Sequence, residues 1–478
     1  MNNTLVWLQW LYALPFVLIW LFFLRRRRQR EQQARITLKD TTEAGLTEPV
    51  SLHPLIDPLK CVGSGGCVSA CPEGAVIGII EGKANLIDPT RCIGHGACAD
   101  ACPHQAISLV FGTERRGVDI PVLNDDFQTS VSGIYIAGEL GGMGLIRNAV
   151  TQGRQAMEAI AASLSQSQGQ SDVSVEQSAS DETPHLLDVL IIGAGPAGLA
   201  AALSAKEQGL SYQMLEQESL GGTIAHYPRG KVVMTQPAAL PLVGKFQFRE
   251  VSKETLMDFW TQLANQQQLI IQTGQCVEKV LPHSNGFTVS SSLTRSASIV
   301  GDKDDVGDRT LWQTRRILLC IGRRGTPRKL GVPGEDQPHV VYRLIDPEQY
   351  QHQSVLVVGG GDSALEAAIA LADQPGTQVT LCYRGNAFNR ARSKNRDQLH
   401  EKVVTGSICL LLNANVTKIE ATTADILCDA IPDHVDNRGA NTRVSIQADT
   451  VLVAAGGVLP TTFLHKTGIQ IDTRYGTV

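Results

Sequence analysis

Six of the eleven cysteines in this 478-residue chain lie between residues 61 and 102. The segment contains an internal repeat with an offset of 31 residues. Each copy consists of L-I-D-P, two spaced cysteines and then C-P. Thiolates are soft donors that suit iron, and patterned cysteines indicate a cofactor site more than disulfides. The residues at the repeated positions are Cys61, Cys67, Cys71, Cys92, Cys98 and Cys102.

This repeat, over residues 50–112, resembles the two-cluster bacterial ferredoxins, whose run C-x2-C-x2-C-x3-C-P gives three thiolates to one iron–sulfur cluster and the fourth to its neighbour. The second cysteine of each run is replaced here, by Ser64 and by His95. Each site is then a three-iron cluster, or a four-iron cluster whose last iron takes His95, Ser64 or a solvent oxygen. A cluster-free ferredoxin-like fold is the alternative. The resemblance implies one cluster on Cys61, Cys67 and Cys102 and another on Cys92, Cys98 and Cys71.

A second constellation follows an apolar predicted strand. Gly193, Gly195 and Gly198 form G-x-G-x-x-G before an alanine-rich helical pattern, and the next predicted strand ends at Glu216. The glycines permit a tight turn and close approach of a pyrophosphate, the helix N-terminus offers amide donors, and the acid binds a ribose hydroxyl. The pattern predicts a dinucleotide site.

A similar fingerprint occurs again at Gly359, Gly361 and Ala364, also between a predicted strand and a helix. The strand after it is followed by basic residues, including Arg384 and Arg390, and not by an acid. An acid would hold the 2′-hydroxyl of NADH, whereas basic side chains accommodate a 2′-phosphate. The pattern therefore favours NADPH; a solvated arginine-rich loop is the alternative.

With these motifs, residues 187–478 resemble the flavoproteins of the thioredoxin-reductase type, especially the ferredoxin reductase and bacillithiol reductase branches. A G-G-T segment containing Gly222 and Thr223, with Tyr227 after it, resembles the family's flavin loop. The resemblance implies two Rossmann-like domains, one for FAD and one for NADPH. Thioredoxin reductases carry C-x-x-C before the second fingerprint, but residues 336–353 contain no cysteine, so dithiol exchange loses its reagent.

The flavoproteins of this family close with a strand and helix of the form T-x-V-x-G-h-Y-A-x-G-D, whose acid reaches the flavin. The matching stretch lies upstream here, at residues 129–139, and ends in Gly138 and Glu139 before a helical pattern. We therefore expect a circularly permuted FAD domain with Glu139 close to the FAD ribityl chain. Exchange of this element within a homodimer stays open.

The first residues of the chain predict a membrane anchor. Residues 5–24 carry no charge and would form a helix about 30 Å long, which matches the bilayer core. Five arginines follow within residues 25–30, so the positive-inside rule predicts a single-pass protein of the inner membrane with its other domains in the cytoplasm. A helix lying on the membrane surface is the alternative.

Composition excludes several other classes of protein. Hydrophobic residues make up 43% and charged residues 19%, which are ordinary globular values, and the net charge of -5 gives no nucleic-acid signature. The expected α/β organisation is an anchor with a basic flank at 1–30, a small α+β ferredoxin-like domain at 50–112, the permuted element at 113–162, a flexible linker at 163–186, the FAD domain at 187–335, the NAD(P)H domain at 336–445 and a return to the FAD domain at 446–478.

Together these patterns predict a membrane-anchored, FAD-dependent NAD(P)H oxidoreductase. It would pass electrons between NADPH, FAD and the clusters, to or from an electron-transfer protein or a membrane redox complex. No acid–base residue is required for this chemistry. One alternative is an FAD-dependent reductase of disulfides or low-molecular-weight thiols, and another is a non-catalytic redox sensor.

Overall fold

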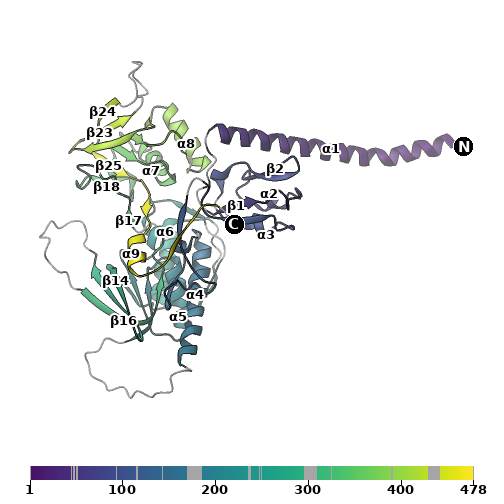
Figure 1. The fold of residues 1–478 in the computed structure, drawn as a ribbon. Helices are drawn as coiled ribbons and strands as arrows, with labels where there is room; N and C mark the ends of the chain where they lie inside the picture. Colours follow the sequence, from purple (N-terminus) through teal and green to yellow (C-terminus); the bar gives the residue numbers. More distant parts are fainter. Residues whose placement is uncertain are drawn as a thin grey trace. The chain divides into compact units, whose positions relative to one another are not determined.

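A computed structural model gives the fold (Figure 1). The chain forms two compact units: unit 1 comprises Met1–Gly117, Ala387–Arg396 and Arg474–Val478, and unit 2 comprises Val118–Asn386 and Asp397–Thr473. The side chains of residues 1–13 are outside the description. The described residues are all except 1, 45, 47–48, 50–51, 93, 115–116, 143, 169–185, 235–237, 247, 249, 295–308, 324–325, 389–390, 429–441 and 477–478.

Unit 1 contains a small α+β fold that repeats itself. Its two helices, α2 (Gly66–Ala70) and α3 (Ala97–Asp100), begin with the same offset of 31 residues that relates the cysteines. Two antiparallel strand pairs accompany them, so the sequence repeat is also a repeat of structure. The pairs are β1 (His53–Ile56) with β4 (Ile107–Val110) and β2 (Ile77–Ile80) with β3 (Lys83–Leu86).

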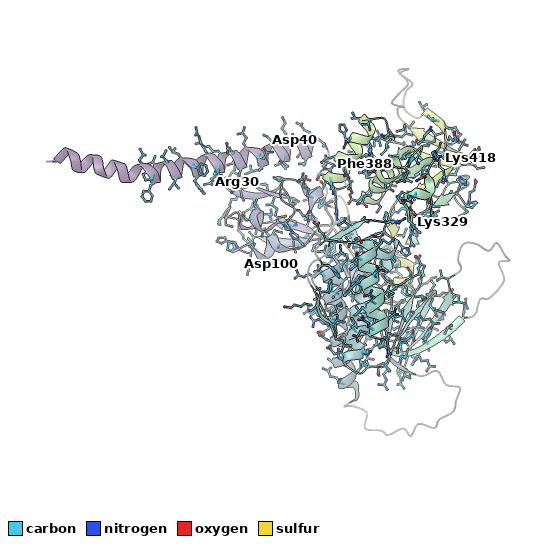
Figure 2. All side chains as sticks on the ribbon, turned by 180° about the vertical axis from the view of Figure 1, so that it is seen from behind. Arg30, Asp40, Asp100, Lys329, Phe388 and Lys418 are labelled. Atoms are coloured by element: carbon cyan, nitrogen blue, oxygen red, sulfur yellow. The ribbon has the colours of Figure 1, made fainter. Side chains whose placement is uncertain are left out.

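A long helix, α1 (Asn2–Glu43), packs the end of its length on this fold, and its other end extends away from it (Figure 1). Ala34 is buried against β2, where a Cβ on Gly78 would lie 2.7 Å from the Ala34 Cβ. The Thr41 hydroxyl donates to the carbonyl oxygen of Ile87 at 2.7 Å. In Figure 2, Arg30 and Asp40 mark this helix, and Asp100 lies on the side of the unit away from it. Helix α1 is thus an integral part of unit 1.

The predicted membrane span lies in the first half of α1. Among the residues whose side chains are described, no helix is both long and apolar enough to cross a membrane. Only residues 14–24 of the predicted span belong to that part, and a span needs about 20 residues. Apolar side chains between Leu14 and Phe23 are exposed. The predicted anchor at 1–30 is therefore not supported by the described residues.

Unit 2 contains two α/β folds, and the first is built on a sheet whose strands run β13-β8-β7-β16-β15-β14, with β6 as a further partner of β16. The pairs β13–β8, β8–β7, β7–β16 and β16–β6 are parallel, and β14 and β15 extend the sheet in antiparallel fashion. The strands are β6 (Ile134–Ile136), β7 (Leu187–Ile192), β8 (Tyr212–Glu216), β13 (Ile271–Thr273), β14 (Gln275–His283), β15 (Gly286–Leu293) and β16 (Arg309–Leu319).

Helices cover this sheet because its strands are apolar on both faces, as in parallel sheets generally. Successive side chains of β7 point to opposite faces. One face packs against α4 (Ile146–Gln168), α5 (Pro196–Glu207) and α6 (Lys253–Gln266), where Trp260 is fully buried. The other face packs against Leu464 of α9 (Thr461–Lys466).

Strand β6 and helix α4 precede β7 in the chain but lie within its fold. Ile134 to Ile136 pair with Ile317 to Leu319 of β16, the strand beside β7. Helix α4 crosses α5 closely, since a Cβ on Gly153 would lie 2.1 Å from the carbonyl oxygen of Ala197. The helix continues to Gln168, beyond the predicted start of the linker at 163, and residues 169–185 lie outside the description.

The second α/β fold has a parallel sheet with the strand order β18-β25-β19-β20-β21. Because β25 pairs with β19, the chain leaves this sheet after Val453, later than the predicted boundary at 446. Its elements are β18 (Val340–Val341), β19 (Ser354–Val358), α7 (Asp362–Ala372), β20 (Gln378–Cys382), α8 (Ser393–Val404), β21 (Ile408–Leu411) and β25 (Thr450–Val453).

The remaining strands form small antiparallel sheets. Strands β17 and β26 pair with each other. Strand β5, near the start of unit 2, pairs with β27, near its end. The bounds are β5 (Val118–Pro121), β9 (Val232–Met234), β10 (Ala238–Leu240), β11 (Gly244–Phe246), β12 (Glu250–Ser252), β17 (Thr326–Pro327), β22 (Asn415–Ile419), β23 (Thr423–Cys428), β24 (Thr442–Gln447), β26 (Gly457–Val458) and β27 (Ile471–Arg474).

Candidate functional site

One cavity in unit 1 is lined by the thiols of Cys61, Cys67 and Cys102, and we call it the first cavity. Two of these cysteines come from the first run and one from the second, which is the crossed arrangement expected from the resemblance. The sulfur atoms of Cys61 and Cys102 each accept a backbone N–H hydrogen bond at 3.3 Å. Such bonds stabilise a thiolate. Ser64 also lines this cavity and is exposed.

Another cavity in unit 1, the second cavity, is lined by Cys71, Cys92 and Cys98 and by His95. The ring nitrogen Nδ1 of His95 accepts a hydrogen bond from the backbone N–H of Ala97 at 3.3 Å. The other ring nitrogen, Nε2, is buried and has no hydrogen-bond partner among the described residues. The two cavities therefore differ at equivalent positions, one having an exposed hydroxyl and the other a buried imidazole nitrogen.

The donors of both cavities fit iron–sulfur clusters. They are thiols, and burial raises the pKa of Cys92 to about 11 and is the main cause of the raised pKa of Cys67, Cys71 and Cys98. Iron must displace their protons when it binds. Within the described residues no three His, Cys, Asp or Glu side chains converge as closely as one metal ion requires. In a four-iron cluster each thiolate binds a separate iron, and such a cluster needs no convergence on one point.

The first dinucleotide loop, between β7 and α5, has the geometry that each glycine predicts. A Cβ on Gly193 would lie 2.5 Å from the carbonyl oxygen of Cys320, and one on Gly198 would lie 1.9 Å from that of Gly193. Gly195, in contrast, faces open space. The outer glycines thus permit tight packing of strand, turn and helix, while the middle one leaves room for a phosphate at the N-terminus of α5.

The predicted partners of this loop lie beside it. The buried carboxylate of Glu216 accepts a hydrogen bond from the backbone N–H of Ala194 at 2.7 Å. A Cβ on Gly222 would lie 3.2 Å from the Cα of Gly195. The carboxylate and the flavin-loop glycine therefore both face the dinucleotide loop. The other two predicted residues of the flavin loop are the exposed Thr223 and the half-buried Tyr227.

The upstream element reaches the same place. The backbone N–H of Gly138 donates to the side-chain oxygen of Gln152, and a Cβ on Gly138 would lie 3.0 Å from the Cβ of Ala197, at the start of α5. Glu139 follows directly after Gly138 and is half-buried. This carboxylate is thus carried by the segment that contacts the N-terminal turn of α5.

The second dinucleotide loop, between β19 and α7, follows the same plan. A Cβ on Gly359 would lie 2.4 Å from the carbonyl oxygen of Ala454, just as Gly193 approaches Cys320 in the first loop. Gly361 faces open space, and Ala364 is fully buried where the first loop has its third glycine. Two sites that can receive a pyrophosphate are therefore present in unit 2.

An aromatic residue that sequence reasoning missed lies against this second loop. Tyr383 follows β20, and a Cβ on Gly360 would lie 2.2 Å from its ring. The glycine pattern indicates this close contact, because the fingerprint itself does not require the middle glycine of G-G-G. Arg384, the first of the predicted phosphate contacts, is exposed, whereas Arg390 lies outside the described residues.

The end of the same basic segment belongs to unit 1. Residues Ala387–Arg396 are grouped there, and the Arg396 guanidinium donates to the Thr90 hydroxyl at 3.2 Å. Thr90 in turn donates to the buried carboxylate of Asp88 at 2.6 Å. Thr90 precedes Cys92 by two residues. Within unit 1, Arg396 thus contacts the loop that carries a cysteine of the second cavity.

Comparison with known proteins gives two family matches. Residues 190–477 match the family described as pyridine nucleotide-disulphide oxidoreductase, and residues 53–103 match the 4Fe-4S dicluster domain. The recognised resemblance to both groups is confirmed, and these groups imply FAD, NADPH and iron–sulfur clusters.

Individual relatives include two ferredoxin–NADP reductases and a bacilliredoxin reductase. The enzyme of Ignicoccus hospitalis is 29% identical over 48% of this chain and 64% of its own length. The enzyme of Levilactobacillus brevis is 33% identical over 45% of this chain and 59% of its own length. The bacilliredoxin reductase of Bacillus subtilis is 25% identical over 60% of this chain and 82% of its own length. The chain thus spans less than two thirds of the two ferredoxin–NADP reductases.

Proposed function

Because the chain belongs to the pyridine nucleotide-disulphide oxidoreductase family, we propose that it is an NADPH-dependent flavoprotein that exchanges electrons between FAD and two iron–sulfur clusters on the same chain. The observation that carries this proposal is the coexistence of two open dinucleotide loops with two three-cysteine cavities. The partner would be an electron-transfer protein or a redox complex. The ferredoxin–NADP reductases among the relatives support this class of partner.

In this proposal the protein binds and orients its cofactors and needs no general acid or base. When bound, the flavin would convert between the two electrons of one hydride and single electrons. Gly195 and Gly361 admit the two pyrophosphates, Glu216 faces the first loop, and the N-termini of α5 and α7 supply amide donors. The six repeated cysteines are the proposed cluster ligands, and Ser64 and His95 occupy the positions where each run lacks a cysteine.

We further propose that residues 113–162 complete the FAD domain as a circularly permuted element, with Glu139 near the ribityl chain. The pairing of β6 with β16 and the approach of Gly138 to Ala197 support this placement. An unpaired edge of β16 would be exposed without β6. Because β6 pairs within the same chain, a second copy is not needed to supply it.

Selection of NADPH is proposed to depend on the basic residues after β20. An Arg384→Glu variant is expected to bind NADPH more weakly by about 1–3 kcal/mol, the scale of a hydrogen bond to a charged group, and to leave NADH binding nearly unchanged. Titration of each nucleotide against flavin absorbance in the holoprotein measures this. Lys418→Glu on β22 makes the same charge change away from the second dinucleotide loop and serves as the control. Equal losses for both nucleotides in Arg384→Glu would contradict the assignment.

The bacilliredoxin reductase relative favours a second candidate, an FAD-dependent disulfide or low-molecular-weight-thiol reductase. Against a dithiol mechanism, burial raises the pKa of Cys382 to about 12 and also raises that of Cys320, so neither is a thiolate near neutral pH. NADPH turnover with a small mixed disulfide that persists unchanged in cluster-free variants would select this candidate. Turnover that needs the clusters selects the first.

Attachment to a membrane remains a separate proposal. The exposed apolar side chains between Leu14 and Phe23, followed by arginines, support it, and α1 joins this segment to unit 1. Deletion of residues 1–30 is expected to abolish flotation with vesicles containing acidic phospholipid and to keep the flavin and iron content. Glu31 onward, including Ala34 and Thr41, stays in place in this variant. Flotation equal to that of the full chain would contradict the anchor.

A further inference from the structure

We propose that His95 donates a hydrogen bond from Nε2 to the cluster of the second cavity and is not an iron ligand. The inference rests on the proposed function in one respect, since it requires a cluster on Cys71, Cys92 and Cys98. Of the alternatives that the sequence leaves open for the last iron, it excludes ligation by His95. The sequence places an imidazole at the ligand position, and only the hydrogen bonding of its two nitrogens distinguishes the roles.

The position of the ring proton follows from the backbone. Nδ1 of His95 accepts from the N–H of Ala97 at 3.3 Å, so its lone pair is used. A neutral imidazole has one N–H, which must then be on Nε2. Ligation through Nε2 would require the proton on Nδ1, where it would meet the N–H of Ala97 head-on. A metal-bound histidine instead donates its other N–H to an acceptor, and the backbone here presents a donor.

The place of His95 in the cavity and the burial of Nε2 indicate the acceptor. His95 lines the second cavity together with three cysteines, and Nε2 is buried without a partner among the described residues. A buried N–H without an acceptor costs about 1–3 kcal/mol. Cluster sulfide and thiolate sulfur are acceptors that carry negative charge, and a cluster in this cavity would therefore satisfy the orphaned donor.

Two consequences follow for the second cluster. The protein supplies three thiolates to it, so it is a three-iron cluster or a four-iron cluster whose last iron binds solvent. A hydrogen bond to sulfur also stabilises the reduced, more negative state, because hydrogen bonds to the sulfurs tune cluster potentials. Ser64 is exposed at the equivalent position of the first cavity, and we expect no comparable contribution there.

The test measures nitrogen hyperfine coupling and the midpoint potentials of the clusters in anaerobically prepared holoprotein carrying ¹⁵N-histidine. Pulsed electron paramagnetic resonance is expected to show only weak ¹⁵N coupling. His95→Leu should lose this coupling at the second cluster, keep its iron and sulfide content, and shift that cluster to a more negative midpoint potential. His95→Gln, which keeps an N–H donor, should recover part of that shift. Ser64→Leu is the matched control and should leave the second cluster unchanged.

Two results would overturn the inference, and they are distinguishable. Strong coupling typical of a bound imidazole, together with loss of iron in both His95 variants, would make His95 a ligand and leave the proposed function intact. Flavin-replete protein without iron or sulfide would overturn the proposed function itself, and the role of His95 with it.

Discussion

A Cys98→Ser variant is expected to lose the second cluster while it keeps the first cluster and FAD. Cys98 is buried in the second cavity, and a hydroxyl is a poorer ligand for iron than a thiolate. Changes to groups that only support a ligand already cost roughly 10–100-fold in metal affinity, and loss of a ligand should cost at least as much. The iron and sulfide content per flavin should therefore fall by about half, and the paramagnetic signal of the second cluster should be lost.

Two further variants test this expectation, one as the equivalent change and one as the control. Cys67→Ser is the equivalent change in the first cavity and should remove the other signal, because Cys67 occupies the same place in its run. Cys409→Ser makes the same chemical change on β21, outside both cavities, and should leave iron and sulfide unchanged. If Cys98→Ser and Cys67→Ser removed both signals together, the two cavities would not hold independent clusters.

A Gly153→Val variant is expected to lose FAD and much of its stability. Its Cβ would lie 2.1 Å from the carbonyl oxygen of Ala197, so α4 would have to move away from α5 and the dinucleotide loop. Overpacking of a core commonly costs about 1–3 kcal/mol, and contact with rigid backbone places this change at the upper end or beyond it. Denaturant unfolding and the flavin content after gel filtration measure both effects.

Gln155→Val on the same helix is the control, since it adds the same β-branched residue at an exposed position. Helix propensity alone would favour Gly153→Val, because valine is a better helix former than glycine and a poorer one than glutamine, so a larger loss in Gly153→Val reports the clash. Equal stability and equal flavin content in Gly153→Val and Gln155→Val would mean that α4 is not required by the FAD domain. The proposed permutation would then fail, although the fold of the second dinucleotide domain would be unaffected.

The local chemistry of this protein could be predicted from its sequence because each motif specifies its own geometry. The glycines at 193, 195 and 198 serve a turn, an open approach and a close packing, and the structure contains all three features. The spacing of these glycines carries the information because the residues are close in sequence. For the cysteines, the repeat indicates a cofactor site, and the exchange of one cysteine between the two groups is what the resemblance to two-cluster ferredoxins implies.

Contacts between distant segments could not be predicted in this way. The fit of Ala34 into the space above Gly78, and the pairing of β5 with β27, join segments whose sequences give no mutual signal. The predicted boundary at 446 precedes β25 for a related reason. Its buried Val-rich strand would suit either sheet, and only its pairing with β19 decides. The tautomer of His95 depends on one backbone N–H, which no residue pattern encodes.

The central claim, that electrons pass between NADPH, FAD and the clusters within one chain, is tested most directly by rapid freeze-quench electron paramagnetic resonance. Anaerobic holoprotein is mixed with NADPH, and flavin absorbance is followed in parallel. We expect flavin reduction first and cluster reduction afterwards, with the second step missing for the affected cluster in Cys98→Ser and Cys67→Ser. Protein with chemically reduced clusters should run the same step in reverse when given NADP⁺. Complete flavin reduction with no change in either cluster, and no formation of NADPH in the reverse experiment, would mean that electrons do not pass between flavin and clusters.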